Sequence, residues 1–259
     1  MSSARYYFKL AWFRFREPFT DWKSTLVGHI LFVFFVWFLS WMWLRFSAKN
    51  TQFTFQTILL YVGVTELLFL TFLRARSIQD GTEDFALFLA RPRSWILREL
   101  FSHLGIAGGA RLFYLLILVV ITPFFGIPIL PSLGFFARTL GLIILLAPAQ
   151  ALISTLFSAL LLNFSQTRYF ILPISKIFLS LGGVFGPVSD FGEPYRSIFL
   201  NLPGSDLFFQ AAHIAIFGHP FEQSFAEWFL RILVICLGLY LCALFFYLRG
   251  RRRFEAWGG

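Results

Sequence analysis

Long apolar runs separated by short polar connectors dominate the pattern of this chain. Runs rich in Phe, Leu, Ile and Val recur from one end to the other. A helix of about 20 apolar residues is long enough to cross the ~30 Å hydrocarbon core of a bilayer. The pattern predicts an all-α, polytopic membrane protein whose six transmembrane helices lie near residues 26–46, 55–73, 100–122, 135–162, 169–187 and 228–248. No internal repeat is visible, so 1–259 is expected to form a single membrane domain.

The N-terminal segment 1–22 differs from these runs because it mixes basic and aromatic residues. On a helix, Arg5, Lys9 and Arg16 fall on one side, and the aromatic residues lie largely elsewhere. This pattern is typical of a helix that lies in the headgroup layer, and Pro18 is expected to end it. The segment therefore predicts an N-terminal interfacial helix, with a solvated leader as the alternative.

Residues 188–226 have a composition between that of a loop and that of a span. They are too polar and too rich in Pro and Gly to cross the bilayer, yet they contain the apolar stretch LFFQAAHIAIFG. Broken backbone at membrane depth has to be covered by protein. A re-entrant segment on the outer side is therefore predicted. Within the fourth span, Pro148 is expected to interrupt the helix.

The distribution of Lys and Arg sets the expected orientation. If the N-terminus is cytoplasmic, most basic residues fall in inner segments, including the tail 249–259. The outer segments then hold few basic residues: Arg45, Lys49, Arg138, Arg196 and Arg231. Since inner loops are enriched in Lys and Arg, both termini are predicted to be cytoplasmic.

Overall composition agrees with this assignment and narrows the chemistry. Hydrophobic residues make up 58% of the 259 residues and charged residues only 14%, against about 25% in soluble domains. The net charge of +9 is explained by topology, so nucleic acid is not an expected partner. Membrane lipid is. Both cysteines, Cys236 and Cys242, fall in one span, which excludes a disulfide between them.

The connector between the second and third spans, 74–99, carries most of the charge of the central region. Its core reads SIQDGTEDFALFLARPRSWILREL. Gly81 permits a turn, and the acidic residues after it complement the start of a short helix. A cytoplasmic docking surface for a soluble partner is predicted, with a hydrated loop as the alternative. Its candidate residues are Asp80, Gly81, Glu83, Asp84, Phe85, Arg91, Pro92 and Arg93.

Two ionisable residues fall inside predicted spans, Glu66 in the second and Arg111 in the third. A charged group in hydrocarbon is costly unless it is paired or hydrated. An intramembrane ion pair between them is predicted, with direct contact to a substrate as the alternative.

Motifs for catalysis are missing from the sequence. It contains no G-x-x-x-x-G-K-[ST] loop for nucleotide phosphates and no H-E-x-x-H, and its Cys and His residues have no metal-ligand spacing. Its histidines are scattered at His29, His103, His213 and His219. We therefore expect no enzyme activity, metal or bound cofactor in this chain itself.

The order of these elements resembles the type-2 class of ABC exporter permeases. The stretch LLYVGVTELLFLTFLRARSIQDGTEDFALFLARPRSWILRELFSHL is similar to the second span and connector of permeases that export capsule or O-antigen polysaccharides. GGVFGPVSDFGEPYRSIFLNLPGSDLFFQAAHIAIFG is similar to their fifth-span end and re-entrant region. In this class, residues such as Tyr195, Arg196, Asn201 and Pro203 would form the outer rim.

The resemblance implies a transport subunit of the bacterial inner membrane. Two permeases, expected to be a homodimer, would pair above two copies of a cytoplasmic ATP-binding subunit, which binds ATP and Mg. The connector would then be the coupling segment, and the substrate a polysaccharide or lipid-linked glycan. An exporter of drugs, peptides or lipids, a secondary transporter or channel, and an intramembrane lipid enzyme are the alternatives.

Overall fold

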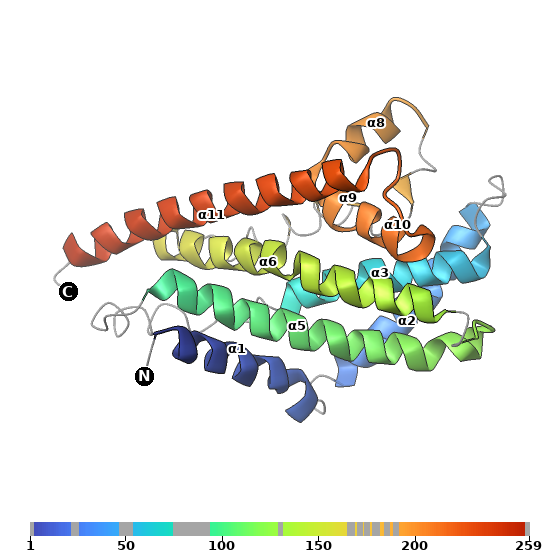
Figure 1. The fold of residues 1–259 in the computed structure, drawn as a ribbon, viewed down its shortest axis with the longest axis horizontal. Helices are drawn as coiled ribbons and strands as arrows, with labels where there is room; N and C mark the ends of the chain where they lie inside the picture. The colour runs from blue at the N-terminus through green and yellow to red at the C-terminus, as the bar shows by residue number, and fades with distance from the viewer. Residues whose placement is uncertain are drawn as a thin grey trace.

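The computed structural model describes residues 3–21, 26–46, 54–74, 94–128, 132–164 and 192–256, with 169, 173, 177, 182–183 and 187–188. In these ranges every regular element is a helix (Figure 1). The helices are α1 (Ser3–Thr20), α2 (Leu26–Phe46), α3 (Phe55–Arg74), α5 (Trp95–Ile121), the 3-10 turn η2 (Thr122–Phe125), α6 (Leu133–Asn163), α8 (Tyr195–Leu200), α9 (Pro203–Leu207), α10 (Phe209–Phe217) and α11 (Phe225–Ala256).

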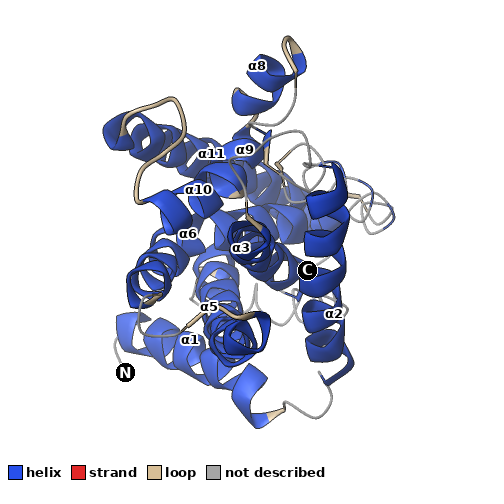
Figure 2. Ribbon diagram, turned by 90° about the vertical axis from the view of Figure 1, so that its right-hand side faces the viewer, coloured by secondary structure: helices blue, strands red, loops and turns tan. Residues whose placement is uncertain are grey.

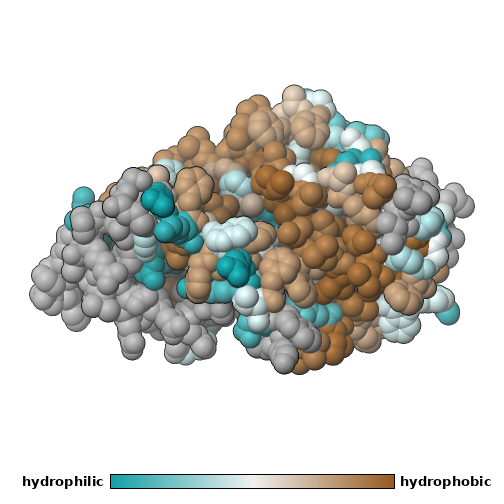
Figure 3. Space-filling view, turned by 60° about the horizontal axis from the view of Figure 1, so that its bottom comes forward, coloured by the Kyte–Doolittle hydropathy of each residue, from teal (hydrophilic) through white to brown (hydrophobic). Residues whose placement is uncertain are grey.

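Four of the described helices are long and apolar enough to cross a membrane. They cover Leu26–Arg45, Trp95–Phe125, Leu133–Asn163 and Phe225–Arg252. Figure 3 shows a broad apolar face on one side of the molecule, as expected for a surface that meets lipid tails. The prediction of an all-α membrane protein is confirmed.

The six predicted spans are matched only in part. In α3 the apolar stretch Phe55–Leu70 is shorter than the four candidate spans. The predicted fifth span, 169–187, lies almost wholly outside the described residues.

Helix α3 forms the centre of the bundle (Figure 2), where it contacts α2, α5, α6 and α10. Its side chains from Ile58 to Leu68 are almost all buried, including Leu59, Val62 and Leu67, which are fully inaccessible. A helix enclosed by other helices is in contact with protein on most of its surface, so it presents little surface to lipid.

Helix ends follow local hydrogen bonds more closely than they follow hydropathy. Helix α11 begins at Phe225, before the predicted 228, because Ser224 and Glu227 form a reciprocal cap. The Ser224 backbone N–H donates to Glu227 Oε2 over 2.8 Å, and the Glu227 N–H donates to Ser224 Oγ over 3.2 Å. Beyond the apolar region the helix continues through the basic tail to Ala256.

The predicted interruption at Pro148 is wrong. Helix α6 runs through this residue as one element from Leu133 to Asn163. Its neighbours in the bundle are α5 on one side and α11 on another. Proline is tolerated inside membrane helices when adjacent helices and small local adjustments compensate for the lost backbone hydrogen bond.

Helix α1 runs lengthwise along the first part of α5 (Figure 1). Successive contacts repeat every turn: Tyr7 stacks on Phe101, and Phe19 meets Phe113 edge to face. Between these pairs, a Cβ placed on Gly105 would overlap the Ala11 carbonyl oxygen. The two backbones therefore approach as closely as small-residue helix interfaces allow.

The interfacial position of α1 stays a prediction. The repeated contacts keep α1 alongside the first part of α5, and α1 continues past Pro18, where it was expected to end, to Thr20. The glycines on α5 decide this arrangement because side chains at those positions would hold α1 away.

Candidate functional site

The predicted coupling residues Asp80, Gly81, Glu83, Asp84, Phe85, Arg91, Pro92 and Arg93 lie outside the described residues. The structure does describe where the chain leaves this connector, at Ser94 and the start of α5. Ser94 is the N-cap of α5, and its side chain accepts from the Leu97 N–H. N-cap residues of this type fix the first residue of a helix.

Three other helices hold the start of α5 in place. The Tyr7 hydroxyl of α1 donates to the Ser94 carbonyl oxygen over 3.3 Å. Trp95, only 4% exposed, stacks on Tyr247 of α11 with ring centroids 5.4 Å apart and planes 4° from parallel. Ala159 of α6 completes this small apolar cluster. We use the name α5 anchor for these residues together with the polar cluster of the next turn. Its members are Tyr7, Ser94, Trp95, Tyr247, Glu99, His103 and Ser158.

One turn further along, a buried polar cluster joins α5 to α6. Glu99 Oε2 lies 3.4 Å from His103 Nε2, and Ser158 Oγ lies 3.4 Å from both. The side chains of His103 and Ser158 are buried, and the Glu99 side chain is 17% exposed. These residues are the members of a serine-histidine-acid site, so their geometry decides whether such chemistry is possible.

The geometry is that of a structural cluster. In a catalytic triad the acid orients one imidazole nitrogen and the serine uses the other. Here Glu99 and Ser158 both face Nε2, and the buried Nδ1 has no hydrogen-bond partner among the residues that the structure describes. The acid therefore competes with the serine for the same nitrogen. The cluster links two helices and lacks the arrangement of a catalytic triad.

Asn163 makes a second link at this end of the bundle. Its Nδ2 donates to the Phe246 carbonyl oxygen of α11 over 2.6 Å and to the Ala159 carbonyl oxygen over 3.0 Å. A side-chain amide that bonds to backbone carbonyls of two helices fixes their relative register. The end of α6 is thus tied to α11 next to Tyr247.

The two predicted intramembrane charges are both buried. Glu66 is 4% exposed and Arg111 is fully inaccessible. Within the described ranges no ion pair joins them, and the Arg111 guanidinium donates to the Ile143 carbonyl oxygen of α6 over 3.0 Å. Burial inside the bundle agrees with the expectation, whereas the expected direct pairing of these two described residues is not seen.

The predicted rim residues lie in the α8–α10 segment, residues 192–224. Tyr195 is 64% exposed at the start of α8, and Pro203 is the first residue of α9. Arg196 forms an ion pair with Glu222 and lies 5.0 Å above the Phe221 ring. Asn201 Nδ2 donates back to the Ser197 carbonyl oxygen over 2.9 Å. Arg196 and Asn201 thus brace a surface turn.

Side chains from the long helices attach this segment to the bundle. Arg138 of α6 donates through Nε to the Ala215 carbonyl oxygen (2.8 Å) and through a terminal nitrogen to the Ile216 oxygen (3.0 Å), so it caps the end of α10. Trp228 of α11, fully buried, donates to the Asp206 carbonyl oxygen over 3.0 Å. Helices α9 and α10 are consequently buried, whereas α8 is largely exposed. A re-entrant path through the membrane stays a prediction.

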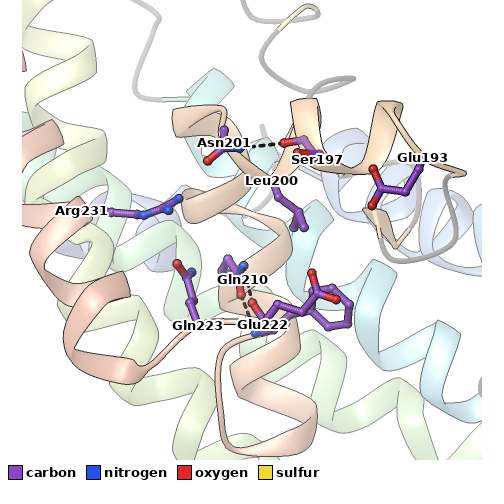
Figure 4. Close-up of a pocket in the computed structure, with 9 residues that line it drawn as sticks. Glu193, Ser197, Leu200, Asn201, Gln210, Glu222, Gln223 and Arg231 are labelled. Carbon is purple, nitrogen blue, oxygen red and sulfur yellow. Dashed lines mark hydrogen bonds between the residues drawn. The ribbon is translucent and has the colours of Figure 1, made fainter.

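A polar pocket of about 260 Å³ opens between α8, the turn before α11, and α11 itself (Figure 4). Its polar lining consists of Glu193, Ser197, Asn201, Gln210, Gln223 and Arg231, with Glu222 and Phe221 at one side. Gln210 is committed to the wall: it donates to the Phe221 carbonyl oxygen and accepts from the Phe221 N–H, over 3.1 and 2.7 Å.

Burial changes the protonation behaviour of two groups in this segment. Burial raises the pKa of the Asp206 carboxyl, and the positive charge of Arg231 together with the Gln223 side chain partly opposes this rise. Burial lowers the pKa of the His213 imidazole, although its hydrogen bond to the His219 carbonyl oxygen, over 2.8 Å, acts in the other direction.

Sequence reasoning missed the α5 anchor and the attachment of α10. Tyr247 and Ser158 look like ordinary residues of apolar runs, and Arg138 served only in the orientation argument. Ser224-x-x-Glu227 was a readable signal, because it matches a capping box. Within the described chain no group of three metal-binding side chains is present.

No protein-family model matches the sequence, and no curated protein matches it either.

Proposed function

We propose that this chain is the membrane-spanning permease subunit of an ATP-driven ABC exporter. In this proposal the connector 74–99 receives force from a cytoplasmic ATP-binding subunit, and six spans with both termini inside carry that force across the membrane. The sequence resemblance and the helical bundle with four candidate spans support it.

The α5 anchor is the observation that carries the proposal. The connector leads directly into Ser94 and Trp95, whose partners lie on α1 and α11, while Glu99 and His103 contact α6. Because packed interiors transmit displacement with little compression, a push on this end of α5 would move several helices together. A connector that served only to join two spans would not need three helices around its exit.

The proposed substrate is a polysaccharide or lipid-linked glycan, moved outward across the bacterial inner membrane by two copies of the chain. Likeness of the connector and of the 182–218 region to polysaccharide-export permeases supports this choice over drug, peptide or lipid export. A closed dimer with a two-fold axis would place the two connectors above the two ATP-binding subunits.

Affinity purification from the native membrane tests the docking. Wild-type protein is expected to bring down a chain that contains a nucleotide-binding loop. Glu83→Arg, Asp84→Arg and Arg91→Glu are expected to lose this chain but remain in the membrane, because reversed charges on a docking surface repel the partner. Arg45→Glu, outside the connector, is the matched control. Undiminished co-purification in all three variants would refute the coupling role.

A second experiment separates docking from force transmission. Tyr247→Leu removes the stacking partner of Trp95 and keeps an apolar side chain on α11. The ATP-binding chain should still co-purify, whereas export by reconstituted vesicles should fall. Export at the wild-type rate would mean that the α5 anchor does not transmit the movement.

A further inference from the structure

The polar pocket beside α8 is lined by two charged side chains that face its interior and by a wall whose side chains bond to one another. Among the described residues, the Glu193 and Arg231 side chains form no ion pair within 4.0 Å, although the Arg231 charge acts at longer range on Asp206 and Glu227. Gln210, Phe221 and Glu222 are instead held by one another and by Arg196. Figure 4 shows Arg231 and Glu193 on opposite sides of the space, with the amides of Asn201, Gln210 and Gln223 between them.

The wall of this pocket is preformed. Glu222 has a left-handed backbone, with φ of 54°, which is uncommon for a residue with a side chain. Its carboxylate pairs with Arg196, and the same guanidinium lies over Phe221. A strained turn persists when surrounding contacts hold it, and such turns are concentrated at ligand sites.

The chemistry of the lining selects the kind of ligand. A carboxylate such as Glu193 only accepts hydrogen bonds, a guanidinium such as Arg231 only donates, and the amides of Asn201 and Gln223 do both. Groups on the ligand must therefore donate on one side and accept on the other. Hydroxyl groups are the simplest groups that do both, and several are needed to reach all the walls.

Charge and size restrict the ligand further. Glu222 is paired with Arg196, and the Arg231 charge also acts on Asp206 and Glu227. A ligand that reaches across the pocket would bring an anionic group toward Glu193 or a cationic group toward Arg231, so the lining favours a neutral ligand. The volume of about 260 Å³ is below the ~300–1,000 Å³ of sites for drug-sized ligands. One small unit fits, and a long chain does not.

We infer that the pocket between Glu193, Gln223 and Arg231 binds a single neutral sugar unit. The inference extends the proposed function, on which its biological role rests, by assigning a sugar-binding subsite to the α8–α10 segment. The sugar hydroxyls would accept from Arg231 and donate to Glu193, with the Gln223 amide between them.

Saturation-transfer NMR on the purified full chain tests this binding. The protein is held in a detergent without a sugar headgroup, and the probes are free D-glucose, N-acetyl-D-glucosamine, D-glucuronate and D-glucosamine. We expect transfer to the two neutral sugars, and a fall of about tenfold in their affinity, equivalent to about 1.4 kcal/mol, in Arg231→Gln and in Gln223→Ala. Arg45→Gln, a basic residue on α2, should bind as the wild type does.

Each alternative outcome overturns the inference. Transfer to neither neutral sugar, preference for the charged sugars, or binding that survives both pocket substitutions would each refute it. A folding defect in one variant leaves the other to decide, since their side chains come from different elements. Failure of the proposed function is separately visible: the wild-type protein would then bind sugar but co-purify with no ATP-binding chain.

Discussion

The α5 anchor and the α8–α10 segment lie toward different ends of the bundle and are attached to it in different ways (Figure 1). At the anchor, Trp95 stacks on Tyr247, and α1 approaches α5 closely at Gly105. In the α8–α10 segment, Arg138 and Trp228 reach backbone carbonyls through single side chains. Apolar packing holds the anchor, and it also buries α9 and α10 against the bundle. The difference is that α8 is largely exposed, so the second region leaves a polar pocket open beside it.

This difference suits two different tasks. A lever has to move as one body, and apolar packing at native density resists deformation. A binding segment has to present hydrogen-bond donors and acceptors to a ligand. On the exposed side of the α8–α10 segment these polar groups stay accessible. The following predictions test how far this contrast holds, beginning with the largest expected effect.

Removal of the stacked ring should damage the anchor most. Trp95→Ala deletes a large buried side chain, and such deletions cost about 3–5 kcal/mol. The free energy of unfolding in mixed detergent micelles measures the loss. Trp12→Ala is the control because this ring, on α1, is 61% exposed. Equal losses in the two variants would contradict the claim that packing holds the anchor.

The seam between α1 and α5 should not tolerate a methyl group. Gly105→Ala and Gly109→Ala place a Cβ onto the backbone of α1, near Ala11 and Phe15 respectively, and overpacking costs about 1–3 kcal/mol. Gly141→Ala on α6 is the matched control, since its Cβ meets nothing within 4 Å. That change should be neutral or stabilising by up to about 1 kcal/mol, because Ala is the better helix former.

Thermal unfolding of these three glycine variants in the same detergent gives the comparison. A loss at Gly141 as large as the loss at Gly105 would show that helix propensity, and not contact with α1, explains the effect.

Loss of the α10 cap should loosen only the α8–α10 segment. Arg138→Gln removes the donors to the Ala215 and Ile216 carbonyl oxygens, and the net value of such bonds is about 1 kcal/mol each. Hydrogen exchange should rise in 209–217 and stay unchanged in 95–105. Faster exchange in both regions would mean that the two regions are not independent.

The smallest effect concerns pH and His213. Burial lowers the pKa of this imidazole below its ordinary value of about 6.5, so the folded segment keeps it neutral while the unfolded chain binds a proton. The stabilisation is therefore complete above about pH 6.5 and is lost as the pH falls toward the folded pKa. His213→Asn keeps a donor near the position of Nδ1 but does not titrate, so its thermal stability should depend less on pH.

The effects of two other groups in this segment, Asp206 and His219, have to be separated from that of His213. Asp206 titrates in the opposite sense, since burial raises its pKa and protonation then favours the folded segment; it cancels when the wild type and His213→Asn are compared. His219→Asn is the control for the exposed neighbouring imidazole. Identical pH profiles for the wild type and His213→Asn would contradict a role for His213.

Apolar runs in the sequence were enough to predict the class of fold and the approximate positions of α2, α5, α6 and α11. They did not predict where α5 begins, because Ser94 and Trp95 belong to a polar connector by composition and to a helix by their cap and stacking contacts. They also led to the wrong expectation at Pro148, where neighbouring helices keep α6 continuous.

The candidate sites were less predictable than the helices. No spacing rule connects the residues that line the pocket. Glu193 is far in sequence from Gln223 and Arg231, and Gln223 lies in the turn before the helix that carries Arg231. Glu99 and His103 are four residues apart on one helix, so their contact could have been read from the sequence. Ser158, their partner on α6, could not.

By itself the sequence determined that this chain forms helices long and apolar enough to span a membrane, because transfer of apolar side chains out of water depends on composition and length and not on partners. The tertiary structure alone decided that α1 runs along α5, that three helices surround the exit of the connector, and that a polar pocket forms beside α8. These features depend on which surfaces meet, and a glycine or an arginine acquires its role only when another helix supplies the backbone that it contacts.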